Sequence, residues 1–223
     1  MRKSLIIFLF LTGCIGEDII FDEVQPEIRI TNPLISIEIS TSYQFEFMMI
    51  NNIGEEVIPD MMTWSSSDET KLTIDNSGLA NAVDYGTVMV TVNASHGTLE
   101  VEKAFELEIT DGTVTMPTSR IGTVASTSSY KLQGDFELRL DGDNLILELA
   151  DNYEASTALP GLFVYLSNNA NSSASAYEIG AVTQFNGAHS YTIQNVGLYD
   201  YQYVLYFCKP FNVKVGHGEI VDP

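Results

Sequence analysis

The sequence predicts an all-β protein made of two β-sandwich domains. Short runs of β-branched and aromatic residues recur along the chain, and turns rich in Gly, Asn, Asp and Ser separate them. Several runs alternate polar with apolar residues, as TVMVTV does at 87–92 and FELEI at 105–109, which is the pattern of a strand with one buried face. The length of 223 residues accommodates two such domains, and beyond the first 13 residues no segment has the pattern of a helix.

The first 13 residues have the pattern of an export signal. Two basic residues at 2–3 precede an apolar run at 5–11 (LIIFLFL). This run is too short to cross a bilayer as a helix, because a span takes roughly 20 apolar residues. We therefore expect residues 1–13 to be removed on export.

The apolar run ends in four residues that resemble the lipobox of bacterial lipoproteins: Leu11, Thr12, Gly13 and Cys14. In that family a diacylglyceryl group is attached to the cysteine and the chain is cut before it, so the resemblance implies that Cys14 becomes the lipid-bearing first residue. The resemblance also implies several acyl chains on Cys14 and hence a lasting anchor. We expect an outer-membrane lipoprotein of the cell envelope. An ordinary signal peptide with a chance cysteine is the alternative.

Acidic residues dominate the chain, whose formal net charge is −20. Binding to nucleic acid requires a basic surface, so we expect no nucleic acid partner. High negative charge favours solubility and repels anionic membrane surfaces. Next to the lipid site, ED at 17–18 resembles the surface-export signals of some Gram-negative lipoproteins, and a solvated tether is the alternative.

We expect residues 14–28 to form a tether and residues 29–110 to form the first domain, with strands at 34–39, 43–49, 71–74, 86–93 and 104–109. Within this domain, TWSSSD at 63–68, LTIDNSGLA at 72–80 and AVDYGTVMVTV at 82–92 together resemble the bacterial immunoglobulin-like domain, group 2. Trp64 is expected to fill the core between the sheets, and Gly78 to occupy a turn that needs positive φ. In the family such modules act as spacers or take part in adhesion and carbohydrate contact, and we expect a spacer here.

Residues 111–119 are expected to form a linker and residues 120–221 the second domain. Its predicted strands lie at 121–124, 135–140, 145–149, 162–166, 190–193, 201–208 and 213–215, and DGDN at 141–144 predicts a hairpin turn.

The chain has two cysteines, and lipidation of Cys14 leaves Cys208 without a partner in the same chain. Cys208 ends a strand that is apolar on both faces (YVLYFC at 203–208), and such a strand is usually covered on both sides. Regular pairing is expected to stop near Pro210, where the thiol can approach the surface. The alternative is that Cys208 is a small buried apolar residue of the core.

The second domain resembles the DM-thirteen domain, a β-rich family described as an electron-transfer domain and linked to the DOMON superfamily. The matching segments are GDF at 134–136, LPGLFVYLS at 159–167, EIG at 178–180, NG at 186–187 before Tyr191, and YVLYFCKPFNV at 203–213 before Gly216. The resemblance implies a redox role for Cys208, as a bare thiol or as part of a site for a prosthetic group such as haem. Lys209 is adjacent, but consecutive strand residues point to opposite faces.

Other chemistry is sparse in the sequence. His189 and His217 are both expected in solvated loops, no Cys-x-x-Cys-His motif for covalent haem is present, and no metal-ligand spacing stands out. Tyr199 and Tyr201 are candidates for a binding patch, although such aromatics more often pack in a β core. Two functions stay open: an envelope redox module with its own redox partner, and a non-catalytic binding or adhesion protein in which Cys208 is structural. The sequence does not identify an enzyme.

Overall fold

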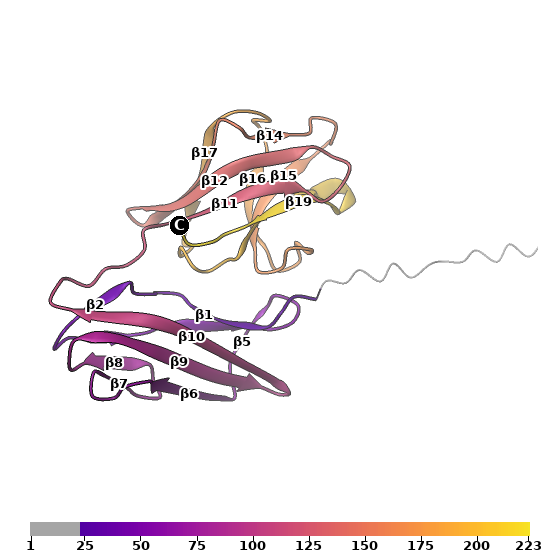
Figure 1. The fold of residues 1–223 in the computed structure, drawn as a ribbon. Coiled ribbons are helices and arrows are strands. Elements are labelled where there is room, and N and C mark those ends of the chain that lie inside the picture. The colour runs from indigo at the N-terminus through magenta and orange to yellow at the C-terminus, as the bar shows by residue number, and fades with distance from the viewer. Residues whose placement is uncertain (1–22) are drawn as a thin grey trace, which may run out of the picture.

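The computed structural model describes residues 23–223 and confirms the all-β prediction (Figure 1). Two β domains follow each other along the chain, and residues 111–118 connect them. Within the described residues the helical content is one short 3-10 turn, η1 (Lys209–Phe211). The same part of the chain contains no helix long and apolar enough to cross a membrane.

The first domain is a sandwich with one four-stranded sheet, β2-β10-β9-β6, in which β2 runs parallel to β10. The opposite layer consists of two three-stranded sheets, β1-β4-β5 and β3-β8-β7. The strands are β1 (Glu27–Ile30), β2 (Ser36–Glu38), β3 (Ser42–Gln44), β4 (Phe47–Ile50), β5 (Glu56–Val57), β6 (Met61–Ser66), β7 (Leu72–Ile74), β8 (Leu79–Ala82), β9 (Gly86–His96) and β10 (Leu99–Thr110). β1 thus begins two residues before position 29, where the first domain was expected to start.

The core of the first domain forms around Trp64, as the sequence predicts. Trp64 is 6% exposed and stacks on Phe45 with ring centroids 5.9 Å apart, while Phe47 meets it edge-on at 6.1 Å. Valines at alternate positions of β9 face the same core, which explains the alternating pattern of that strand. The turn before β8 also matches the prediction, because Gly78 has φ +84°.

One expected strand, at 43–49, is divided into β3 and β4. The reason is a change of partner: β3 pairs with β8, whereas β4 pairs with β1. Between them Phe45 N donates to Gly78 O at 3.0 Å, and Glu46 N donates to Asn32 Oδ1 at 2.7 Å. Sequence alternation continues through the break, so it does not reveal the switch.

The second domain is one nine-stranded sheet that wraps around its own core and nearly closes. The strand order is β16-β15-β18-β19-β11-β12-β13-β17, and β14 pairs with β12. The strands are β11 (Ser119–Ser126), β12 (Leu132–Asp141), β13 (Asn144–Leu149), β14 (Glu154–Ala155), β15 (Leu162–Ser167), β16 (Tyr177–Ala181), β17 (His189–Gln194), β18 (Tyr203–Cys208) and β19 (Val213–Glu219).

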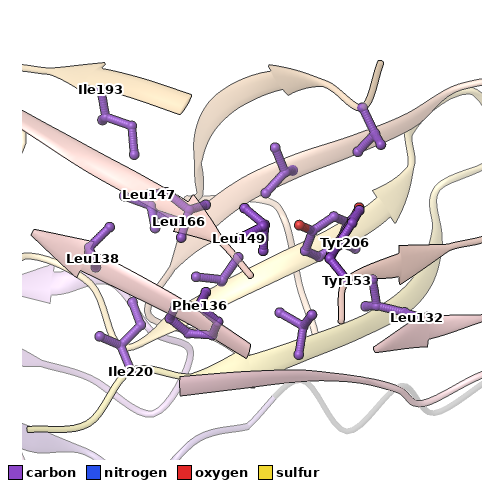
Figure 2. Packing of buried hydrophobic residues seen from close by; sticks show 14 of the residues in the cluster. Leu132, Phe136, Leu138, Leu147, Leu149, Tyr153, Leu166, Ile193, Tyr206 and Ile220 are labelled. Carbon is purple, nitrogen blue, oxygen red and sulfur yellow. The ribbon is translucent and has the colours of Figure 1, made fainter. Parts of the chain in front are cut away.

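The two end strands of this sheet approach each other, since Tyr177 Oη in β16 donates to Gln194 O in β17 at 3.4 Å. Figure 2 shows how Phe136, Leu147, Leu166 and other buried side chains fill the enclosed space. The predicted hairpin turn is also present: β12 ends at Asp141, β13 begins at Asn144, and Gly142 between them has φ +61°.

Candidate functional site

The residues predicted to carry the lipid lie outside the described part of the chain. Leu11, Thr12, Gly13 and Cys14 precede residue 23, so their role stays a prediction. The candidate redox residue, Cys208, lies within the described part.

Cys208 is a free cysteine and is 0% exposed. It ends β18, between Leu162 of β15 and Val213 of β19. β18 is covered on both faces, as its composition predicts: Val204 and Tyr206 belong to the main core, whereas Leu205 and Phe207 pack in a second cluster with Tyr165. The thiol therefore lies inside packed protein rather than at an open strand end.

The chain just beyond Cys208 packs against Gly161, the residue before β15. Lys209 N donates to Gly161 O at 3.0 Å, and a Cβ on Gly161 would lie only 2.9 Å from the Pro210 ring. The Lys209 ammonium lies 2.6 Å from Glu178 Oε2 and 4.8 Å from the centre of the Phe163 ring. The Lys209 ammonium thus contacts a carboxylate and an aromatic ring and not the thiol. Consecutive strand residues point to opposite faces, so this separation from the Cys208 thiol is expected.

Both histidines of the second domain lie in strands, not in solvated loops as expected. His189 begins β17, and its Nδ1 is 2.9 Å from Gly187 O. His217 is in β19, where it packs edge-on against Tyr203 at 5.6 Å. Burial lowers the pKa of His217, and the Lys214 charge lowers it further. Among residues 23–223 no group of three or more His, Cys, Asp or Glu side chains is arranged to hold a metal ion.

A cleft of about 850 Å³ lies between the two domains. One wall comes from β1 and β10 of the first domain, and the other from the start of β11 and the last residues of the chain. The linker closes the back, where Ile35 N donates to Thr115 O at 2.8 Å. Apolar side chains at its rim include the partly exposed Ile35, Met116 and Val221.

Arg29 joins the two domains from the first-domain wall. Although it belongs to β1 it is only 6% exposed, and its Nη1 donates to Asn168 Oδ1 at 2.7 Å and to Asp200 O at 3.0 Å in the second domain. Its Nη2 forms an ion pair with Glu27. A buried charge requires such partners, since an uncompensated one is strongly destabilising.

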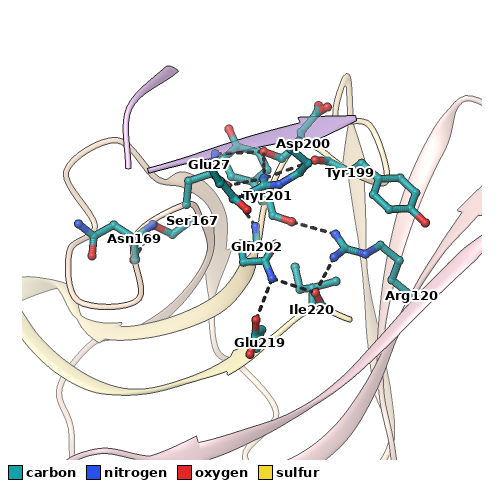
Figure 3. A network of polar contacts seen from close by, with 12 residues as sticks. Glu27, Arg120, Ser167, Asn169, Tyr199, Asp200, Tyr201, Gln202, Glu219 and Ile220 are labelled. Atoms are coloured by element: carbon teal, nitrogen blue, oxygen red, sulfur yellow. Dashed lines mark hydrogen bonds and ion pairs between the residues drawn. The ribbon is translucent and has the colours of Figure 1, made fainter. Parts of the chain in front are cut away.

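Arg120 is the corresponding residue of the second-domain wall and is 5% exposed. Its Nη2 donates to Ile220 O at 2.6 Å and its Nη1 to Tyr201 O at 3.2 Å (Figure 3). The guanidinium also lies over the Tyr199 ring, 4.6 Å from its centre. Burial lowers the pKa of Arg120, whereas the Asp222 carboxylate acts in the opposite direction.

A second contact brings the two backbones close together. Asn169 Nδ2 donates to Ile53 O at 3.0 Å, and a Cβ on the neighbouring Gly54 would lie 2.8 Å from the Asn169 Cβ. Gly54 also has φ +84°, so both the close approach and the backbone conformation favour glycine at this position. With Arg29, this contact holds the domains on either side of the cleft.

Sequence reasoning did not single out Arg29 or Arg120. One signal was present: Arg29 lies between two isoleucines in EIRI, in a chain with only 10 basic residues. Tyr199, which was named as an alternative patch residue, is 7% exposed and packs against Arg120 instead.

No family model matches the chain, and no curated protein matches it. Among solved structures, the chain is similar to domains 5–6 of the S-layer protein SbsC, with 14% sequence identity over 90% of this chain and 97% of that one. The TM-score is 0.31, which is too low to support an inference about function.

Proposed function

We propose that this protein is a lipid-anchored cell-envelope protein that binds a ligand in the cleft between its two domains. The observation that carries the proposal is the cleft itself: a hollow of about 850 Å³ whose walls come from both domains and each contain a buried arginine. Ligand sites are found preferentially at domain interfaces, in volumes of this order.

The anchor rests on the four lipobox-like residues that end in Cys14. Lipid on this cysteine would hold the protein at the outer membrane, with the acidic tether leading to the first domain. The test is fractionation of cells that express the wild type or Cys14→Ser. We expect the variant to leave the membrane fraction, and an unchanged distribution would contradict lipidation.

The first domain serves as the spacer in this proposal. The parallel pairing of β2 with β10 and the Trp64 core are consistent with an immunoglobulin-like module. Its contacts through Arg29 and Asn169 also make it one wall of the cleft. The second domain, DM-thirteen-like by its sequence segments, supplies the other wall.

Burial of Cys208 favours the binding function over the redox alternative. A reactive thiol is typically partly exposed in electropositive surroundings, whereas this one is 0% exposed and the Lys209 ammonium is engaged by Glu178. The redox alternative predicts that oxidised glutathione forms a mixed disulfide with Cys208 in the native protein, releasing one glutathione thiol. The redox alternative also includes a bound haem, and a new visible absorbance band on titration with haem would reveal it. We expect neither result.

The binding function itself is tested by a fragment screen on the isotope-labelled chain, read by NMR. We expect the small organic fragments that bind to shift resonances of residues lining the cleft. Hits scattered over both domains without enrichment at the cleft would contradict the proposal.

A further inference from the structure

The walls of the cleft contain two buried guanidinium groups. Arg29 comes from β1 and Arg120 from β11, both line the hollow, and both are more than nine-tenths buried. Burial is the main cause that lowers the pKa of Arg120, and the charge of Arg29 lowers it further. The chain has a net charge of −20, so two buried cations beside one cleft stand out against its excess of acidic residues.

The hydrogen-bonding capacity of these guanidinium groups is not exhausted by the protein. Among the described residues, Arg29 Nε is buried without a hydrogen-bond partner. Arg120 Nε is also buried without a hydrogen bond, and its ion-pair contact is the Asp222 carboxylate at 3.4 Å. Buried polar groups are almost always hydrogen-bonded in native proteins, so Arg29 Nε indicates a further acceptor, and the long contact of Arg120 Nε leaves room for a closer one.

The acids of the cleft engage these arginines from its edge. Glu27 pairs with Arg29 and is 41% exposed, while Asp222 lies 3.4 Å from Arg120 Nε and is 66% exposed. Asp222 Oδ1 also accepts a hydrogen bond from Tyr199 Oη at 2.7 Å. The Asp222 carboxylate therefore shows which groups a carboxylate contacts at this place: the Tyr199 hydroxyl and the Nε edge of the Arg120 guanidinium.

Resting on the proposed binding function, we propose that the cleft binds a small organic molecule through an oxyanion, a carboxylate or a phosphate, placed between Arg29 and Arg120. Guanidinium groups suit both oxyanions because their planar donors match them in geometry and charge. The apolar body of the ligand would contact Met116 and Val221 at the rim. An added negative charge also offsets the proximity of the two cations.

The test is an NMR titration of the full chain with 4-phenylbutyrate, its neutral isostere 4-phenylbutanamide, and inorganic phosphate. We expect the carboxylate to shift the Arg29 and Arg120 Nε–H resonances saturably, and the amide to bind at least tenfold more weakly. Phosphate shifting the same resonances as strongly as phenylbutyrate would identify phosphate as the oxyanion and the apolar contacts as secondary.

Asp222→Ala sharpens the test, because it removes the acid that competes for Tyr199 and Arg120. We expect this variant to bind phenylbutyrate at least about tenfold more tightly, the size of one charge-assisted hydrogen bond. The matched control is Asp151→Ala, which removes one exposed acid in the β13–β14 loop, outside the residues that line the cleft, and should leave the Kd unchanged.

Three results would overturn the proposal. Equal binding of the amide and the carboxylate would refute recognition of an oxyanion, although the cleft would remain a binding site. Equal tightening by Asp222→Ala and Asp151→Ala would mean that only net charge matters. No shift of cleft resonances with any probe would count against both the oxyanion and the cleft as a site.

Discussion

The end of β18 and the wall of the interdomain cleft both bury a chemically distinctive side chain, yet their surroundings differ. Cys208 is 0% exposed, and the Lys209–Pro210 segment that follows it packs against Gly161. Arg120 is 5% exposed but lines an open hollow, and its Nε contacts the exposed Asp222 carboxylate at 3.4 Å without forming a hydrogen bond. Burial alone therefore does not mark a site: a buried polar group with incomplete hydrogen bonding in the wall of a hollow is the more informative feature.

Removing Arg29 should give the largest effect. Arg29→Ala leaves Asn168 and the Asp200 carbonyl without their buried donor, and we expect a loss of about 2–4 kcal/mol in the free energy of unfolding of the first domain. Urea denaturation followed by Trp64 fluorescence measures this, because Trp64 is the only tryptophan.

Arg139→Ala is the control for this experiment. Arg139 is 40% exposed and pairs with Glu148 on the surface of the second domain, so its removal should leave the Trp64 transition unchanged. If Arg29→Ala also leaves it unchanged, Arg29 does not hold the domains together.

A polar substitution at Cys208 should have the next largest effect. Cys208→Ser places a hydroxyl in a packed site, and we expect it to destabilise the second domain by about 1–3 kcal/mol in thermal or urea unfolding. Cys208→Ala is the matched variant and should cost less, because it adds no polar group. A serine variant as stable as the alanine variant would indicate that water reaches this position.

The pH dependence of stability should show a smaller effect from His217. Its folded pKa is lowered, so the unfolded chain binds the proton more readily, and the stabilisation present above the unfolded pKa is lost as the pH falls below about 6.5. Urea unfolding between pH 7.5 and 5 should therefore show a steeper loss for the wild type than for His217→Gln. Parallel curves for the two proteins would show that His217 does not titrate differently on folding.

The ion pair between Lys209 and Glu178 should contribute least. Their side chains are 52% and 39% exposed, and exposed pairs contribute about 0–1 kcal/mol. We expect Glu178→Gln to change the unfolding midpoint only marginally and to leave the thiol of Cys208 unreactive. Faster thiol modification in this variant would mean that the ion pair, rather than core packing, protects Cys208.

Much of the fold follows from local sequence pattern. The alternating runs that became β9, β10 and β12, the Trp64 core and the Gly142 turn all depend on residues close in sequence. The division of the strand at Phe45 does not, because it reflects a change of distant partner. The cleft is less predictable still: Arg29 meets Asn168 across 139 positions of the chain, and only the docking of two finished domains brings them together.

The central claim is that the cleft is accessible and the thiol is not, and thiol labelling tests it most directly. In a chain carrying Cys14→Ser, the native rate of Cys208 modification by a charged aromatic disulfide is compared with that of Met116→Cys in a Cys208→Ala background. Met116 lines the cleft and is 46% exposed. We predict that the cleft thiol reacts at the rate of a free thiol and that Cys208 reacts about a thousandfold more slowly, through local opening. Equal rates would contradict the account.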